Sequence, residues 1–434
     1  MPYQPPTALP ANLLNDVELQ RALRRHDFGA VFRIARSRAG IPYARITHEC
    51  DIKPIRVGEV ARGKGRITSF AKVVAISDAL RVPGHMVGLS PRPWEDSGTP
   101  GNENAPENGP TVRRRTVLQA ASTAGLAAAL PALHGPATPL HVTNSYVDGL
   151  RRRTARLRRL DEILGGGDTY RVYLGEYQAT KSLLRDATFT PSSRRKLVAL
   201  LAEQAQQAGW AAFDGGRQAD AESLYDESKT AAVEAEDSDL HGNALAFLAY
   251  QTADPQMAVE IAASSCEALS AGSPAGVRAL LHERLAWACA VAGQASRTER
   301  ALNAAQAALE ERPAGEPQPD WAAWVDETEL NIMTGRCWTE LRRPLRAVPV
   351  LVRALDQYED HHARDKALYL SWLADSYLAA GEVKEAAAVT DRALNLASGV
   401  ASVRPRQRLT PVLRELHQYR NVGAVQNVLQ AAGA

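Results

Sequence analysis

The sequence predicts an all-α protein made of two helical bodies that a flexible linker joins. Alanine is abundant and only 6% of the 434 residues are aromatic, a composition that favours closely packed helices over β-sandwiches. A chain of this length exceeds the usual size of one domain. Hydrophobic residues make up 45% of the chain, and 30 glycines and 25 prolines are spread along it, which excludes collagen-like and wholly disordered proteins.

Two proline-rich stretches divide the chain. Four of the first ten residues are proline, and residues 1–15 show no apolar periodicity, so we expect a disordered arm there. Residues 91–111 contain five prolines and three glycines, with Trp94 as their single large apolar residue, which predicts a flexible linker. The predicted units are therefore a small helical domain at residues 16–90 and a larger helical body at residues 140–434.

The small domain is strongly basic. Between Arg21 and Arg66 there are 12 Lys and Arg but only 4 Asp and Glu, although the whole chain has a formal net charge of only +2. Such an uneven distribution is typical of a polyanion-binding domain on a neutral or acidic body. A merely solvated basic surface is the alternative explanation.

We expect five helices in this domain. Phe28 and Phe32 lie four residues apart on the apolar side of a helix that ends at Gly40. A helix of about eight residues follows, then a tight turn near residues 50–52 and a second short helix that begins near Lys53 or Pro54. Ser69 is placed to cap a further helix. Two short helices joined by a tight turn form a helix-turn-helix, which inserts its second helix into the major groove of DNA.

Residues 41–63, IPYARITHECDIKPIRVGEVARG, resemble the helix-turn-helix of the phage-repressor-like (XRE-type) transcription regulators, whose pattern is roughly LSQxxLAxxLGVSQSTVSRIERG. The match has no gap, and its closing Arg-Gly falls on Arg62 and Gly63. The family's apolar core positions correspond to Ile41, Ile46, Cys50, Ile52, Val57 and Val60. The sequence departs from the family at Asp51, where the turn glycine stands, and at Pro54, where a base-reading glutamine is usual.

The resemblance implies which residues contact DNA. The exposed candidates of the second helix and its surroundings are Tyr43, Lys53, Ile55, Arg56, Glu59, Lys64 and Arg66. Arg56 suits a bidentate pair with guanine, and Glu59 suits a bond from cytosine. In the alternative interpretation, Arg56 and Glu59 only pair with each other, and the domain does not bind DNA.

The larger body repeats itself. Its template is a small residue, a small or aromatic residue three positions on, a turn residue four further, an alanine five further, and two more small or apolar positions. Three copies follow it: Gly209, Ala212, Gly216, Ala221, Tyr225 and Ser228; Gly335, Trp338, Arg342, Ala347, Leu351 and Ala354; and Ala374, Tyr377, Gly381, Ala386, Thr390 and Ala393. Weaker copies lie at residues 246–262 and 286–302. The template alanines Ala221, Ala258, Ala347 and Ala386 are 37, 89 and 39 residues apart, and the middle gap holds a further copy and a proline-rich insertion at residues 313–319. This spacing resembles the tetratricopeptide repeat, which implies an α-solenoid of paired antiparallel helices.

The compartment is predicted from two features. The four cysteines, Cys50, Cys266, Cys289 and Cys337, form no close pair, which excludes a disulfide framework and favours the cytoplasm. Residues 112–135 contain Arg114 and Arg115 followed by a stretch rich in alanine and leucine, so they look like a twin-arginine export signal. Such signals belong at a chain's start. We therefore expect an apolar helix that packs on the repeats, with membrane association or export as the less favoured alternative.

The sequence lacks the common catalytic and metal-binding motifs. The sequence has no H-E-x-x-H, G-x-S-x-G or Walker motif, so we expect no enzyme, no cofactor and no metal. Taken whole, the chain resembles actinobacterial transcription regulators that fuse a phage-repressor-like domain to a tetratricopeptide body. The resemblance implies a sequence-specific regulator of double-stranded DNA whose repeat groove receives a peptide or protein. The habit of the family, rather than any residue of this sequence, also implies a homodimer. A tetratricopeptide scaffold with a vestigial DNA-binding domain is the main alternative.

Overall fold

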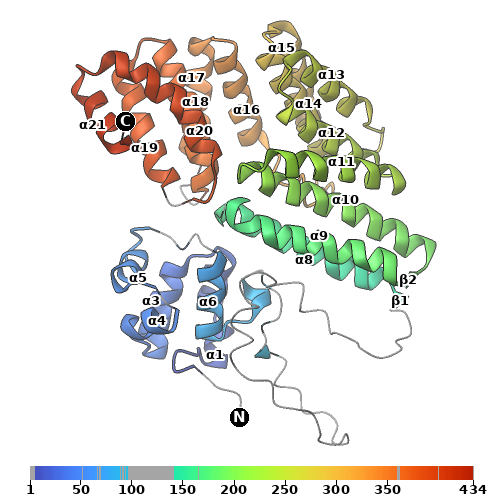
Figure 1. The fold of residues 1–434 in the computed structure, drawn as a ribbon, viewed down its shortest axis with the longest axis vertical. Helices are drawn as coiled ribbons and strands as arrows, with labels where there is room; N and C mark the ends of the chain where they lie inside the picture. Colours follow the sequence, from blue (N-terminus) through green and yellow to red (C-terminus); the bar gives the residue numbers. More distant parts are fainter. Residues whose placement is uncertain are drawn as a thin grey trace, which may run out of the picture. The chain divides into compact units, whose positions relative to one another are not determined.

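The structure, a computed structural model, describes residues 5–50, 52–65, 67, 70–87, 89, 92, 94–95, 141–164, 166–358, 362–398 and 400–433. It divides into two compact units, Met1–Leu140 and His141–Ala434. Within the described residues, the chain is almost entirely α-helical (Figure 1). The exceptions are two-residue parallel strands, β1 (His141–Val142) and β2 (Thr188–Phe189). The predicted all-α class is confirmed.

The N-terminal unit contains six α-helices and one 3₁₀ turn in its described part. These are α1 (Ala11–Leu14), α2 (Val17–Arg24), α3 (Phe28–Ala39), α4 (Tyr43–Cys50), α5 (Pro54–Ala61), α6 (Phe70–Leu80) and η1 (Gly84–Met86). Phe28 and Phe32 are buried on α3, as their spacing predicts. Asp27 caps α3 by accepting a hydrogen bond from the Ala30 N–H, and Gly40 ends it in a left-handed conformation. Ser69, the expected cap of α6, lies outside the described residues.

The expected disordered arm over residues 1–15 is wrong where the structure describes it. Leu9 and Leu13 are buried, and the Leu9 N–H donates to the Leu80 carbonyl at 2.9 Å. The Thr7 hydroxyl donates to the Ala79 carbonyl at 2.6 Å. The sequence shows no apolar periodicity here, because only two leucines dock this segment and it forms only one short helix.

The expected linker also begins too early. Arg92 forms a bidentate ion pair with Asp78 of α6, with nitrogen–oxygen distances of 2.7 and 2.8 Å. The indole N–H of Trp94 donates to the same carboxylate at 3.0 Å, and Arg81 stacks on the Trp94 ring. These contacts attach the described residues after position 91 to the N-terminal unit. The apolar segment expected at residues 112–135 lies outside the described residues.

The C-terminal unit is a succession of helices in which neighbours along the chain pack together (Figure 1). It begins with α8 (Asn144–Leu164) and α9 (Gly166–Asp186). The following pairs are α10 (Pro191–Asp214) with α11 (Gln218–Glu234), α12 (Ser238–Gln251) with α13 (Pro255–Glu267), α14 (Ala275–Val291) with α15 (Ala295–Glu310), α16 (Glu327–Glu340) with α17 (Pro344–Gln357), and α18 (Ala363–Ala379) with α19 (Val383–Ala397). The unit ends with α20 (Arg404–Leu416), η4 (His417–Tyr419) and α21 (Gly423–Ala432). We call the N-terminal member of each listed pair its first helix.

Small residues of the repeat template lie where paired helices touch. A Cβ added to Gly209 of α10 would lie 2.5 Å from the Tyr225 ring of α11, and one added to Gly335 of α16 would lie 2.4 Å from Leu351 of α17. The template's turn position adopts a left-handed backbone in Gly216 and Gly381, and even Arg342 has a φ of 53° there. The template therefore describes one recurring helix-pair geometry.

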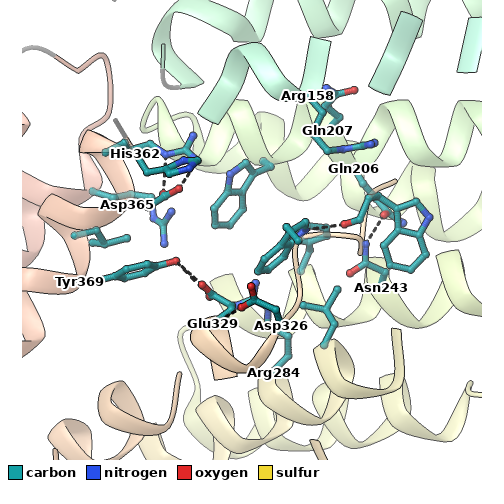
Figure 2. A pocket seen from close by; sticks show the side chains of 18 of the residues that line it. Arg158, Gln206, Gln207, Asn243, Arg284, Asp326, Glu329, His362, Asp365 and Tyr369 are labelled. Atoms are coloured by element: carbon teal, nitrogen blue, oxygen red, sulfur yellow. Dashed lines mark hydrogen bonds and ion pairs between the residues drawn. The ribbon is translucent and has the colours of Figure 1, made fainter. Parts of the chain in front are cut away.

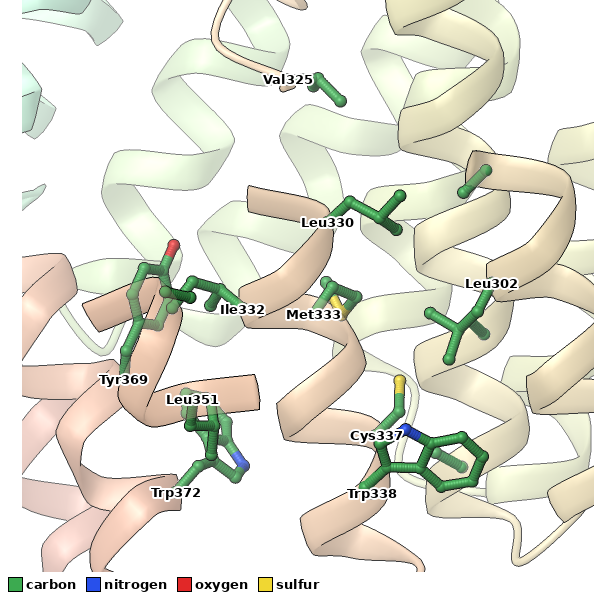
Figure 3. Packing of buried hydrophobic residues seen from close by; sticks show 14 of the residues in the cluster. Leu302, Val325, Leu330, Ile332, Met333, Cys337, Trp338, Leu351, Tyr369 and Trp372 are labelled. Carbon is green, nitrogen blue, oxygen red and sulfur yellow. The ribbon is translucent and has the colours of Figure 1, made fainter. Parts of the chain in front are cut away.

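A continuous apolar core runs through the pairs from α14 to α18. Leu330, Met333 and Cys337 follow one side of α16 at spacings of three and four residues, and all three are buried (Figure 3). Leu351 and Trp372 complete the packing from α17 and α18. This core holds the first helices side by side and fixes the side chains on their opposite face.

The end of the repeat array contacts its beginning. The Ala401 carbonyl accepts a hydrogen bond from the Gly167 N–H of α9 at 2.8 Å. The Ser402 hydroxyl donates at 2.8 Å to the buried carboxylate of Asp214, which is 188 positions away in α10 and also accepts from the Gly166 N–H. The C-terminal unit therefore curls until residues 401–403 meet α9 and α10.

Candidate functional site

Helix α5 is anchored on one face and exposed on the other. Val57 and Val60 are buried, and α3 approaches so closely that a Cβ on Gly29 would lie 2.4 Å from the Val60 carbonyl oxygen. The Arg33 guanidinium also donates to the Ala61 carbonyl at 2.7 Å. On the opposite face, the Ile55 side chain is 75% exposed.

Most of the sequence-predicted site residues surround this exposed face. Lys53 precedes α5 and is exposed, and Lys64 is exposed in the turn after it. The side chains of Arg56 and Glu59 are 42% and 38% exposed, with 3.9 Å between Nη1 and Oε2. A pair with this separation and exposure contributes little stability, so a competing ligand can replace it at small cost. Arg66 lies outside the described residues.

Tyr43 has a different environment. It is the first residue of α4, its side chain is half-buried, and the Arg36 guanidinium lies 4.8 Å from the centre of its ring. Arg36 belongs to α3, so this contact ties the start of α4 to the preceding helix. The predicted site residues that the structure describes therefore come from α4, α5 and the turns that flank α5.

The C-terminal unit contains a second candidate site, a cavity of about 490 Å³ that sequence reasoning missed (Figure 2). First helices from α10 to α18 form most of its wall, and α8, α9, α20 and residues 321–326 complete it. Several residues that directly follow the first small residue of a template copy lie at this cavity. This sequence position could therefore have predicted part of the wall. Of the five such residues, Trp210, Phe247 and Arg336 line the cavity directly, whereas Trp287 and Asp375 do not.

Arginines and aromatic rings alternate on one side of the cavity. Arg336 lies between Trp287 and Trp372, with its guanidinium carbon 4.5 and 4.1 Å from the two ring centres. Arg404 stacks on Trp210 at 4.5 Å. Planar guanidinium groups stack favourably on aromatic faces, so the rings hold these cations in place without neutralising them.

Three arginines converge on one buried tyrosine. The Tyr250 hydroxyl accepts hydrogen bonds from Arg336 and Arg404, both at 3.0 Å, and the Arg284 guanidinium carbon lies 5.5 Å from its ring centre. Burial alone opposes ionisation of the phenol, but the positive charges of Arg336, Arg404 and Arg284 outweigh it and lower the pKa of Tyr250 to about 7. The lowered pKa indicates a positive potential in this part of the cavity.

Two buried carboxyl groups face this region. Glu329 accepts a hydrogen bond from the Tyr369 hydroxyl at 3.1 Å, and burial raises the pKa of Glu329 to about 7 (Figure 2). Both carboxyl oxygens of Glu283 are buried without a hydrogen-bond partner among the described residues. Burial first, and then the nearby Glu329, raise the pKa of Glu283 well above its usual value. The surroundings of Glu283 therefore favour its protonated, neutral form.

Other charged side chains of the wall are paired within the protein. Arg158 binds Glu203 at 2.6 Å, and Arg364 binds Asp365 at 2.9 Å. Asp326 caps α16 by accepting from the Glu329 N–H at 2.9 Å. Arg284 differs, because no hydrogen bond or ion pair joins it to another described residue. Its guanidinium carbon lies near the Tyr250 ring, and its positive charge also acts to lower the pKa of Glu329 and Glu283.

Comparison with known proteins identifies no relative. No protein-family model matches the chain, and no curated protein is significantly similar to it. Among the described helices, none is both long enough and apolar enough to cross a membrane. The fold and the two sites define an all-α protein of packed helix pairs, with an exposed short helix in one unit and an arginine-rich cavity in the other.

Proposed function

We propose that this protein is a sequence-specific, DNA-binding transcriptional regulator whose helical body receives a peptide or protein partner. The observation that carries the proposal is the outward face of α5, where Ile55 is 75% exposed between the exposed cations Lys53 and Lys64. Helices α4 and α5 are each eight residues long and are separated by three residues, as a helix-turn-helix requires.

The residues around α5 divide into two roles in the proposed complex. Lys53, Lys64, Arg66 and Tyr43 neutralise or contact phosphates, which contributes affinity but little sequence preference. Arg56 and Glu59 reach base edges, with Arg56 on guanine and Glu59 on the amino group of cytosine. Their weak mutual ion pair opens when DNA binds, and Ile55 contacts the methyl group of thymine.

The C-terminal unit supports a receptor role. Packed helix pairs with small residues at their contacts resemble a tetratricopeptide solenoid, whose inner surface suits extended ligands. In the proposed regulator, a peptide or protein that binds this body changes how often two DNA-binding units engage their half-sites, which requires a homodimer. A regulator of this kind acts in the cytoplasm, and that location is part of the proposal.

Gel-shift titration of the full chain against genomic fragments tests the proposal. We expect a preference for particular fragments, with affinity that falls steeply as salt increases. Arg56→Ala should weaken specific binding by about tenfold to hundredfold, the usual value of one bidentate base contact. Arg21→Ala is the matched control, because Arg21 is an exposed cation on α2 and should affect binding little.

The opposite result would favour a scaffold. The 3.9 Å contact between Arg56 and Glu59 is the observation that supports this second candidate, because a vestigial helix would keep such a pair closed. Equal binding to all fragments, unchanged by Arg56→Ala, would overturn the regulator and leave the helical body as the functional part.

A further inference from the structure

The cavity of the C-terminal unit contains arginine groups whose hydrogen-bonding capacity the described residues leave unused. Arg284 has no carboxylate partner among the described residues, and the buried Nε–H of Arg336 has no hydrogen-bond acceptor there. Glu203 and Asp365 are paired with other arginines. The carboxyl groups nearest Arg284 and Arg336 are already engaged or disfavoured as anions: Glu329 accepts a hydrogen bond from Tyr369, Asp326 caps α16, and burial raises the pKa of Glu283.

Donors without acceptors lie beside an apolar surface. The buried amide nitrogen of Gln207 also lacks a partner among the described residues, and Gln207 lines the same cavity. Trp210, Phe247 and Trp321 supply flat apolar faces close by. A cavity with a few convergent polar groups on an aromatic lining is the usual form of a small-ligand site.

We propose that this cavity binds a small organic anion, whose carboxylate pairs with Arg284 and Arg336 and whose planar apolar body lies against Trp210 and Phe247. Arg284 offers five N–H donors in a planar fork that matches a carboxylate. This anion would be the partner, or the end of the partner, that the proposed regulator receives. The proposal rests on the proposed function only in treating the helical body as a receptor.

The cavity also limits the size of the ligand. Its volume of about 490 Å³ falls in the range of small-molecule sites. Arg404 of α20 and Glu203 of α10 both line the cavity. Residues 402 and 403, which precede α20, hydrogen-bond to Asp214 at the end of α10, so the two helices are joined at this point. The carboxylate therefore belongs to a free organic acid or to the C-terminal residue of a short peptide.

Isothermal titration calorimetry on the full chain, without DNA, tests the proposal. The probes are N-acetyl-L-tryptophan and N-acetyl-L-tryptophanamide, which share one apolar body and differ in the carboxylate. We expect the acid to bind at least tenfold more tightly than the amide. Glycyl-glycyl-tryptophan and its C-terminal amide form the second arm, and tighter binding of the free-acid peptide than of N-acetyl-L-tryptophan would identify a peptide end as the source.

Two variants assign the effect to the cavity. Arg284→Gln should reduce the tenfold preference for the acid to less than twofold, whereas Arg284→Lys should keep part of it. Arg278→Gln is the matched control, because Arg278 lies on the same helix and pairs with Glu311 outside the cavity. The circular dichroism and melting temperature of both glutamine variants show whether the fold is intact.

The proposal is overturned if neither acid binds at millimolar concentration, if the amides bind as well as the acids, or if Arg284→Gln keeps the preference. Failure of DNA binding is distinguishable from these results, because the calorimetry contains no DNA. A preference for the acids in a protein that ignores DNA would support this site and contradict only the proposed regulator.

Discussion

Replacing Gly209 by alanine should destabilise the protein, although alanine normally strengthens a helix. Alanine gains about 1 kcal/mol over glycine inside a helix. At position 209 the new methyl group would lie 2.5 Å from the Tyr225 ring, which is buried and stacked on Phe247 with 4.9 Å between ring centres. Forcing a methyl group into a packed core costs about 1–3 kcal/mol. The net loss is therefore up to about 2 kcal/mol.

Gly175→Ala is the matched control. Gly175 lies inside α9, and nothing is within 4 Å of a Cβ added there, so this variant should gain up to about 1 kcal/mol. Because both variants share the helix-propensity gain, the difference between them isolates the steric term of about 1–3 kcal/mol. Urea unfolding followed by circular dichroism measures it. A Gly209→Ala variant as stable as Gly175→Ala would refute the view that the template's small residues set the helix contacts.

Three further predictions concern the interior of the C-terminal unit. Tyr250 should show a phenolate absorbance transition near pH 7. Because its pKa is lowered in the folded state, its ionisation should add stability as pH rises from about 7 to 10. Tyr250→Phe should remove the transition from pH-dependent absorbance and the added stability from melting curves. Glu283→Gln should raise the melting temperature more at pH 8 than at pH 5, because the raised pKa makes the native carboxyl group hold a proton that the unfolded one releases above its usual pKa of 4.5. An equal gain at both pH values would count against a raised pKa of Glu283. Asp214→Ala should lower the free energy of unfolding by about 3–5 kcal/mol in urea, because it leaves Arg364 and Arg404 without their shared buried carboxylate. A loss below about 1 kcal/mol would mean that the contact of residues 401–403 with Asp214 adds little stability.

Local patterns predicted local structure well in this chain. The spacing of Phe28 and Phe32 and the position of Pro54 place α3 and the start of α5 correctly, because each depends on residues within one or two helical turns. The template's glycines likewise indicated the contacts and turns of the helix pairs. The segment of residues 5–14 escaped prediction, since its packing depends on α6, more than sixty positions away.

The cavity escaped prediction for the same reason. Its wall combines Arg158 of α8, Glu329 of α16 and Arg404 of α20, and no local pattern brings such distant positions together. The pKa values of Tyr250 and Glu329 follow from burial and from charges on neighbouring helices, which only the folded chain defines. The residues around α5, by contrast, were accessible from sequence because they are consecutive in the chain.

The central claim is that α5 presents its outward face to DNA. Selection from a pool of random duplexes by the full chain tests it most directly, with Ile55→Asp and Val17→Asp compared in parallel. Both residues are large, apolar and exposed, Ile55 on α5 and Val17 at the start of α2. We predict that the unsubstituted protein and Val17→Asp enrich one common DNA sequence and that Ile55→Asp enriches none. Enrichment of the same sequence by all three proteins, or by none, would contradict it.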